Sequence, residues 1–524
     1  MERKFSQYST DRPVKRRQNA LGSGYHICMT KLLAAAGVAL LAALATAQTE
    51  PPIKQIADRL TANGLKADVS FLASDALQGR GTPSPGLDIA AEYIAAQFRR
   101  AGLEPAGDDG YFQTAAYESV TPNVEGLEFT LETAGTTIQA HKESMGLQQA
   151  VAADLSHVPL LKAMGNDGAA IAALTPEQVR GKVLVLEFPD GSNTFMILRQ
   201  IPALTARLQP ALVVLLRASA APSNTSARLR EVSPSSSTPV LLVWDDAIRA
   251  GLGFGKPGVV EAAISVHIPA PTAVPVKLHN VVGVLRGSDT ALRDTYVMVT
   301  AHYDHLGVRG SGDGDHIYNG ANDDGSGTAS VIEIANALAA QAVRPKRSLV
   351  FVTFFGEELG LFGSRYYGAH PVFPLSKTVA DLNLEQVGRT DVDGGSSVGL
   401  INVTGYDFST LTDAVRKAGE ATGLKVVKNE QLNVRYFAQS DNQALADAGV
   451  PAHTISVGYV FPDYHKPSDE WPKLDYDNLA KVDLTIALAV FQVADSLETP
   501  QWNKDTPNTE RYIKARQESL AAGR

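Results

Sequence analysis

Apolar residues recur at two different spacings along the chain, and the change of spacing divides it into segments. Within residues 48–115, apolar positions between 86 and 100 repeat every three or four residues, and Gly102 follows them as a typical helix end. Residues 116–272 instead hold short apolar runs between polar, turn-rich stretches. These runs are 183–186, 212–216 and 240–243. The pattern predicts a mostly helical first segment and then a separate β-rich module.

Residues 273–500 alternate strand-like runs with amphipathic helical stretches. The strand-like runs, rich in β-branched residues, are 281–285, 296–300 and 349–355. The helical stretches, apolar on one side, are 328–338 and 479–490. This alternation predicts an α/β domain with a mixed, mostly parallel sheet and helices on both faces. In such sheets the active site lies at the carboxyl ends of the strands.

Two further segments are predicted from composition. The prolines between Pro269 and Pro275 indicate a linker before the α/β domain. Residues 501–524 are polar and charged, which predicts a loosely ordered tail.

The N-terminus has the three parts of a secretory signal. Lys31 precedes an apolar run over 32–44, and Ala45-Thr46-Ala47 follows as a small-residue cleavage site. We therefore expect residues 1–47 to be removed and the mature protein to be exported, either periplasmic or secreted, with no stable membrane anchor. The alternative is an uncleaved anchor, for which the run is short. Met29 is a second possible start.

Charge and cysteine content exclude several classes of site. The chain of 524 residues has a formal net charge of -9, which argues against a nucleic-acid binder with its clustered Lys and Arg. Cys28 is the only cysteine, so the chain can form neither an intrachain disulfide nor a cluster of thiolate ligands. Any metal site must be built from His, Asp and Glu.

Five clusters of such residues lie in the α/β segment, each at or just after an expected strand end. They are 301–307, 320–327, 354–360, 381–389 and 463–470. Taken singly, each is explained as well by a surface loop or a helix cap. Together, five clusters at one edge of one sheet predict a metal centre. Nitrogen and oxygen ligands without thiolate suit zinc, although manganese or cobalt would also fit.

The chemistry of the clusters agrees with that prediction. His302 directly follows a strand, and Asp304 is placed to support a ligating imidazole. A carboxylate in the glycine-flanked pair Asp323-Asp324 could bridge two cations. In the adjacent pair Glu357-Glu358, one carboxylate could ligate metal while the other accepts a proton from water.

These motifs together resemble the di-zinc aminopeptidase family of clan MH, which includes glutamate carboxypeptidase and glutaminyl cyclase relatives. The resemblance spans about residues 280–500 and extends to 71–81, which is similar to the opening of bacterial members. The β-rich module over 116–272 resembles, in pattern only, the protease-associated domain that many members carry as an insertion.

The resemblance implies a role for each matching residue. His302 would ligate one of two zinc ions with Asp304 supporting it, and Asp323 would bridge both ions, with a cis peptide bond after it. Glu358 and His465 would ligate the second zinc.

Glu357 would be the general base, and Tyr464 would donate a hydrogen bond to the developing oxyanion.

One position departs from the family pattern. Where relatives often read Asn-Leu-Asp, this chain has Glu385, whose extra methylene displaces the carboxylate by ~1.5 Å. We expect Glu385 to complete the first zinc site, with Asp381 as the alternative. Where relatives often have Ser-Asp-His, this chain has Ser440-Asp441-Asn442, a stretch that we expect in a pocket wall and not as a ligand.

The predicted function is a zinc-dependent exopeptidase, most specifically an aminopeptidase acting on peptides with a free N-terminus. A carboxypeptidase or dipeptidase on the same scaffold would need a cation for the substrate carboxylate, for which Arg389 and Arg435 are available. A glutaminyl cyclase-like enzyme would fit a single zinc. A binding protein that has lost its metals should lack several ligand residues, yet all are present. The sequence specifies neither the side-chain preference nor the oligomeric state.

Overall fold

The fold is taken from a computed structural model, which describes residues 53–523 apart from 134, 190–194, 218–226, 233–237, 255–260 and 393–394. The expected signal segment therefore lies outside the described residues. Among the described residues, no helix has both the length and the apolar character needed to cross a membrane.

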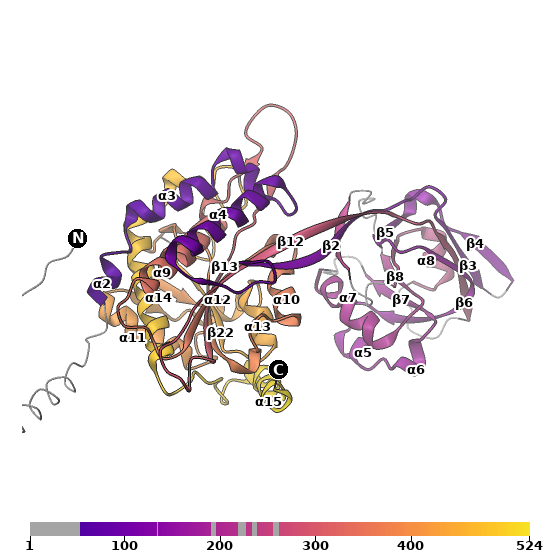
Figure 1. The fold of residues 1–524 in the computed structure, drawn as a ribbon. Helices are drawn as coiled ribbons and strands as arrows, with labels where there is room; N and C mark the ends of the chain where they lie inside the picture. Colours follow the sequence, from indigo (N-terminus) through magenta and orange to yellow (C-terminus); the bar gives the residue numbers. More distant parts are fainter. Residues whose placement is uncertain are drawn as a thin grey trace, which may run out of the picture. The chain divides into compact units, whose positions relative to one another are not determined.

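A ten-stranded mixed sheet carries the α/β part of the chain (Figure 1). Its strands follow the order β21-β20-β22-β17-β13-β16-β12-β2-β9, with β1 beside β12. Their bounds are β1 Glu104–Pro105, β2 Phe112–Thr121, β9 Arg228–Glu231, β12 Thr272–Leu285, β13 Tyr296–His302, β16 Ser348–Phe354, β17 Thr378–Leu384, β20 Leu400–Val403, β21 Lys425–Val427 and β22 Ala452–Ser456. The central strands β16, β13, β17 and β22 are parallel, whereas β12 and β2 join them antiparallel. The predicted mixed sheet is confirmed.

Helices cover both faces of this sheet because its strands are apolar on both sides. Phe351 faces Phe98 of α4 on one side, and the neighbouring Phe354 faces Tyr367 of α10 on the other. The first face carries α3 Ala62–Leu72, α4 Pro85–Ala101, α9 Gly327–Ala339, α11 Leu411–Thr422 and α14 Tyr476–Asp495. The second face carries α10 Phe362–Ala369, α13 Asn442–Asp447 and α15 Glu510–Ala522.

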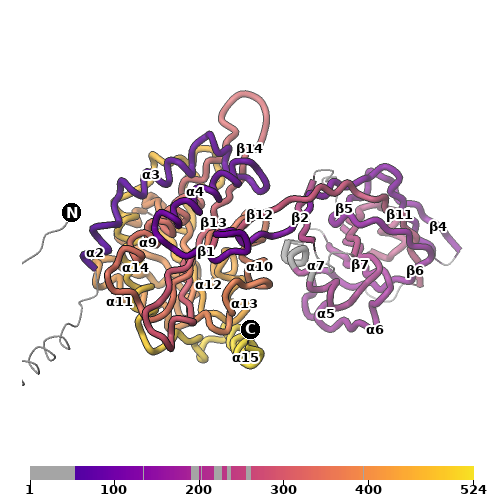
Figure 2. Tube along the Cα trace, in the orientation of Figure 1, coloured from indigo at the N-terminus to yellow at the C-terminus, as the bar shows by residue number. Residues whose placement is uncertain are grey.

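The N-terminal helices belong to the α/β part, as Figure 2 shows for α3 and α4 beside α9 and α14. Helix α4 begins after Ser84, whose side chain accepts from the Leu87 amide, and it ends at Gly102 in the left-handed conformation. The short helix α2 Ile53–Ala57 precedes them, and the turn η1 Asp75–Arg80 connects α3 to α4.

The middle segment forms an eight-stranded sheet of its own, in the order β4-β3-β11-β6-β7-β8-β10-β5. Its strands are β3 Glu128–Thr133, β4 Thr136–Gln139, β5 Met145–Gln149, β6 Ala153–Met164, β7 Val183–Phe188, β8 Leu212–Arg217, β10 Val240–Val243 and β11 Ala262–Ile268. Three short helices and the longer α7 accompany them: α5 Gly168–Ala172, α6 Pro176–Val179, α7 Phe195–Leu208 and α8 Asp246–Gly251. Alternate residues of β7 and β8 enter two separate cores, one on each face. The segment is β-rich as predicted, and its resemblance to a protease-associated domain stays a prediction.

The prediction of a linker is wrong for residues 272–275. Strand β12 starts at Thr272 and pairs with β2 along its length, with Pro275 opposite Glu118. The expected boundaries at 115/116 and 272/273 thus fall within or at the start of long paired strands, and the division into domains stays a prediction.

The prediction of a loosely ordered tail is also wrong. Trp502 stacks on Tyr512 of α15 with ring centroids 4.9 Å apart, and both are buried in the core over the second face. These two aromatic side chains fix a segment whose other residues are mostly polar.

Candidate active site

The carboxyl ends of four parallel strands meet at one edge of the large sheet, and the predicted site residues follow them. His302 ends β13, Glu357 and Glu358 follow β16, and Glu385 follows β17. His465 lies in the loop after β22. The prediction from strand ends therefore places these side chains at the same edge of the sheet.

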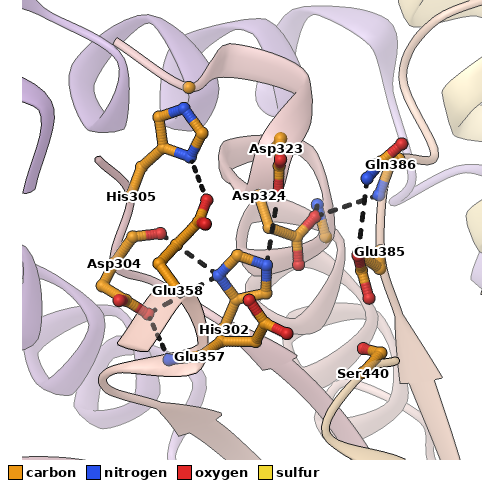
Figure 3. A network of polar contacts seen from close by, with 12 residues as sticks. His302, Asp304, His305, Asp323, Asp324, Glu357, Glu358, Glu385, Gln386 and Ser440 are labelled. Atoms are coloured by element: carbon orange, nitrogen blue, oxygen red, sulfur yellow. Dashed lines mark hydrogen bonds and ion pairs between the residues drawn. The ribbon is translucent and has the colours of Figure 1, made fainter. Parts of the chain in front are cut away.

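Asp323 joins two groups of possible metal ligands. The first group is His302, Asp323 and Glu385, with His302 Nε2 3.4 Å from Asp323 Oδ1 (Figure 3). The second contains Asp323, Glu358 and His305. Asp323 is 2% exposed and is shared by both groups, so its carboxylate is placed as a bridge.

His465 approaches the second group from the solvent side. Its Nε2 lies 3.1 Å from Asp323 Oδ2 and 3.4 Å from Glu358 Oε1. Two ligands on one tetrahedral zinc, each bonded at about 2.0–2.1 Å, lie roughly 3.3 Å apart. The three measured separations between imidazole and carboxylate atoms, including that of His302, match this spacing.

The turn that carries Asp323 is held by its neighbours. It spans η4 Ala321–Ser326, and its Asp323–Asp324 peptide bond is cis, as the family resemblance implies. The buried carboxylate of Asp469 accepts hydrogen bonds from the amides of Asn322 and Asp323. Asp324 Oδ1 accepts from the Gln386 amide at 3.2 Å, which ties this turn to the end of β17.

Asp304 links His302 to the loop of the expected base. Its Oδ1 lies 3.6 Å from His302 Nδ1 and accepts from the Glu357 amide at 3.0 Å. Thr82 Oγ1 donates to the other carboxylate oxygen at 3.1 Å. The predicted supporting position of Asp304 thus coincides with contacts to both elements.

The residues present fit divalent cations. Buried atoms without a hydrogen-bond partner in the described part of the chain include His302 Nε2, Glu358 Oε1 and Glu385 Oε2. Burial raises the pKa of Glu385 to about 7, with Asp323 adding to the effect and His302 opposing it. Unpartnered ligand atoms among crowded carboxylates are costly without a cation to compensate them.

Glu357 and Tyr464 line a small cavity, open to solvent, beside these groups. Burial raises the pKa of Glu357 well above its usual range, and Glu385 and Asp441 add to this while His302 opposes it. Burial also raises the pKa of Tyr464, so its hydroxyl stays protonated. The cavity is lined further by Gln386, Thr404, Tyr436, Gln439, Ser440, Thr454, Ser456 and Tyr459.

Three residues contact the site without having been predicted individually. His305 Nδ1 lies 2.7 Å from Glu358 Oε1. Arg80 is fully buried and donates to the carbonyls of Tyr303 and Gly320, and Asp469 holds the Asp323 turn. His305 and Asp469 lie three and four residues after predicted ligands, and this proximity was the available signal.

Two residues that the sequence offered as site residues have other roles in the structure. Asp381 accepts from the Thr300 hydroxyl inside the sheet and belongs to neither ligand group. Asn442 is fully buried, where it donates to the Phe437 carbonyl and accepts from Thr454. It is therefore a structural residue, and of the stretch 440–442 that we expected in the pocket wall, Ser440 lines the cavity whereas Asn442 does not.

Arg389 is engaged in ion pairs with Asp391 at 2.5 Å and with Asp463 at 2.8 Å. Its guanidinium is therefore occupied, which weakens the proposal that it receives a substrate carboxylate.

Comparison with known proteins gives a consistent picture. Residues 280–490 match the model of peptidase family M28. The aminopeptidase YwaD of Bacillus subtilis (strain 168) is 27% identical over 228 residues, which cover 42% of this chain and 46% of that protein. A probable zinc metalloprotease of Leptosphaeria maculans is 35% identical over 146 residues, covering 28% of this chain and 33% of the relative.

The chain thus spans less than half the length of these two curated relatives. Among solved structures, an aminopeptidase from Aneurinibacillus sp. strain AM-1 is similar with a TM-score of 0.51 and 19% identity. The likeness covers 86% of this chain and all of that one, and it supports the fold.

Proposed function

Residues 280–490 match the model of peptidase family M28, and from that premise we propose that the protein is a zinc-dependent aminopeptidase with two metal positions. The observation that carries this proposal is the pair of ligand groups sharing Asp323. His302 and Glu385 would hold one zinc, and Glu358 and His465 the other. When bound, zinc supplies Lewis-acid polarisation and makes water acidic enough to lose a proton near neutral pH.

Glu357 would act as the general base. Its carboxylate lies in the cavity wall, and its backbone is fixed by the hydrogen bond to Asp304. Because its pKa is raised, it is suited to take a proton from the attacking water and then give it to the leaving amine.

Tyr464 would stabilise the developing oxyanion. Its ring stacks on that of His465, with centroids 3.9 Å apart, which places it at the cavity beside the ligand groups. A protonated phenol can donate a hydrogen bond to negative charge that forms on the carbonyl oxygen.

The composition of the cavity wall bears on which end of a peptide the site receives. Asp323, Glu357 and Glu385 lie in its wall, whereas among the described residues no lysine or arginine lines it. Because zinc would offset the charge of its ligands Asp323 and Glu385, the difference lies in the lack of a side-chain cation in the described wall that could pair with a terminal carboxylate. An aminopeptidase therefore fits better than a carboxypeptidase. The polar wall that would contact the first side chain of the peptide comes from Thr404 after β20, from residues 436–440, and from β22 and the loop after it.

We further propose that the protein is exported, periplasmic or secreted, on the basis of the signal-like residues 1–47.

The test of the mechanism is Glu357→Gln, which keeps the side-chain volume and removes the base. We expect a loss of hydrolysis of aminoacyl p-nitroanilides by at least about 10²-fold, with the zinc content unchanged. Glu92→Gln, at an exposed position of α4, is the matched control and should leave both unchanged. Near-full activity of Glu357→Gln would refute the assignment of the base.

A further inference from the structure

His305 occupies a buried place between the turn η1 and the second ligand group. Its backbone amide donates to the Arg80 carbonyl at 3.2 Å, and its side chain is buried. Figure 3 shows its imidazole directed at the Glu358 carboxylate, with Nδ1 2.7 Å from Oε1. The imidazole thus contacts one of the residues that would bind the second zinc.

The position of this ring is fixed by glycine. A Cβ atom on Gly320 would lie 2.5 Å from Cγ and Cδ2 of His305, closer than such atoms can approach. Gly320 also has a φ of 58°, which favours glycine. The backbone before the Asp323 turn therefore leaves a space that the imidazole fills.

The distance between His305 Nδ1 and Glu358 Oε1 distinguishes two possible roles for the imidazole, as a zinc ligand or as a support for one. If His305 and Glu358 both bound the same tetrahedral zinc, their ligand atoms would lie roughly 3.3 Å apart. The observed 2.7 Å is shorter than this spacing and is that of an ion pair between the imidazole and the carboxylate, in which neither atom makes a hydrogen bond of regular geometry. His465 Nε2, at 3.4 Å from the same oxygen, has the spacing of a second ligand.

A carboxylate oxygen has two lone pairs, so Glu358 Oε1 can face the metal position with one while the other lies on the side of His305 Nδ1. Glu358 lies in the short turn η5 Glu357–Leu359, and His465 is 37% exposed in its loop. His305, by contrast, is buried and its main-chain amide is fixed by the Arg80 carbonyl.

We propose that His305 is a positioning residue that holds Glu358 in place as a ligand of the second zinc, without binding the metal itself. The inference rests on the proposed two-zinc site. Contacts of this kind to a ligating group commonly change metal affinity by about 10–100-fold.

The test uses zinc affinity and not turnover. Full-length protein is stripped of metal and titrated with zinc against a chromophoric chelator, for the wild type, His305→Ala, His305→Asn and His305→Gln. The amide nitrogen of Asn lies the same number of bonds from Cβ as Nδ1, whereas that of Gln lies one bond further. His141→Ala, at an exposed position of the middle segment, is the control.

We expect two zinc ions in the wild type and, in His305→Ala and His305→Gln, a weakening of one of them by about 10–100-fold. His305→Asn should restore most of that affinity, because it can still donate to Glu358. If Asn is as weak as Ala, the imidazole binds zinc directly and the inference is wrong. An unchanged zinc affinity in His305→Ala would also contradict the inference. A wild type that binds no zinc contradicts the proposed function instead.

Discussion

Replacing Arg80 by methionine should destabilise the protein more than any surface change, because one buried guanidinium joins three segments around the site. Its Nε donates to the Tyr303 carbonyl at 2.8 Å, and Nη2 donates to Gly320 at 2.9 Å. Nη1 donates to Asn319 at 2.7 Å and also to Leu72. Two of these acceptors immediately precede the Asp323 turn, and Tyr303 follows His302.

The magnitude follows from opposing contributions. Four hydrogen bonds from a charged donor stabilise the fold by about 1.5–3 kcal/mol each, or roughly 6–12 kcal/mol together. Burial lowers the pKa of Arg80 to about 10 despite nearby carboxylates. That shift from 12.5 corresponds to a cost of about 3 kcal/mol that methionine would remove. Measured losses after breaking buried charged contacts are about 3–5 kcal/mol, and we expect Arg80→Met at that level.

The assay is urea-induced unfolding of metal-free protein, followed by circular dichroism, with Arg80→Lys and Arg59→Met in parallel. Lysine keeps the charge but can make only some of the four hydrogen bonds. The free energy of unfolding of Arg80→Lys should therefore lie between those of the wild type and Arg80→Met. Arg59 is exposed and its replacement should change the free energy of unfolding by less than about 0.5 kcal/mol. A loss below about 1 kcal/mol in Arg80→Met would refute the reasoning, because the four acceptors would then have found other partners.

Three further changes test other parts of the account. Asp68→Asn should stabilise the protein at pH 8 and not at pH 3. Burial raises the pKa of Asp68 from 3.8 to about 7, so the native state favours its protonated form, and that stabilisation is lost as pH rises through about 7. The gain, at most on the order of 4 kcal/mol, is measured by urea unfolding at both pH values, and an equal effect at the two would contradict it. Glu385→Asp should weaken the first zinc by about 10-fold or more, because the shorter side chain withdraws by ~1.5 Å from a fixed backbone; unchanged zinc titration would argue against Glu385 as a ligand. Trp502→Ala should lower the free energy of unfolding by about 3–5 kcal/mol and expose α15 to limited proteolysis, because Trp502 anchors the tail. Resistance to the protease equal to that of the wild type would show that other contacts suffice.

The sequence was informative where function depends on strand ends. Parallel strands bring their carboxyl ends together, so the sequence alone predicts His302, Glu358 and Glu385 at one edge. Long apolar runs and helix ends such as Gly102 also marked their elements correctly.

Features that depend on distant partners were not predictable in the same way. Pro275 reads as a linker residue, yet it lies in a strand because β2, more than 150 residues earlier, supplies the pairing. The tail is ordered by contacts of Trp502 and Tyr512 with a core formed elsewhere. His305 was visible in its motif, but only the folded chain places Glu358 beside it.

The most direct test of the account is the zinc content of the purified protein together with its activity on aminoacyl p-nitroanilides whose amino group is free or acetylated. The account predicts two zinc ions per chain and hydrolysis of the free-amine substrates alone, lost on chelation and restored by zinc. One zinc ion or none, or equal hydrolysis of the acetylated substrates, would contradict it.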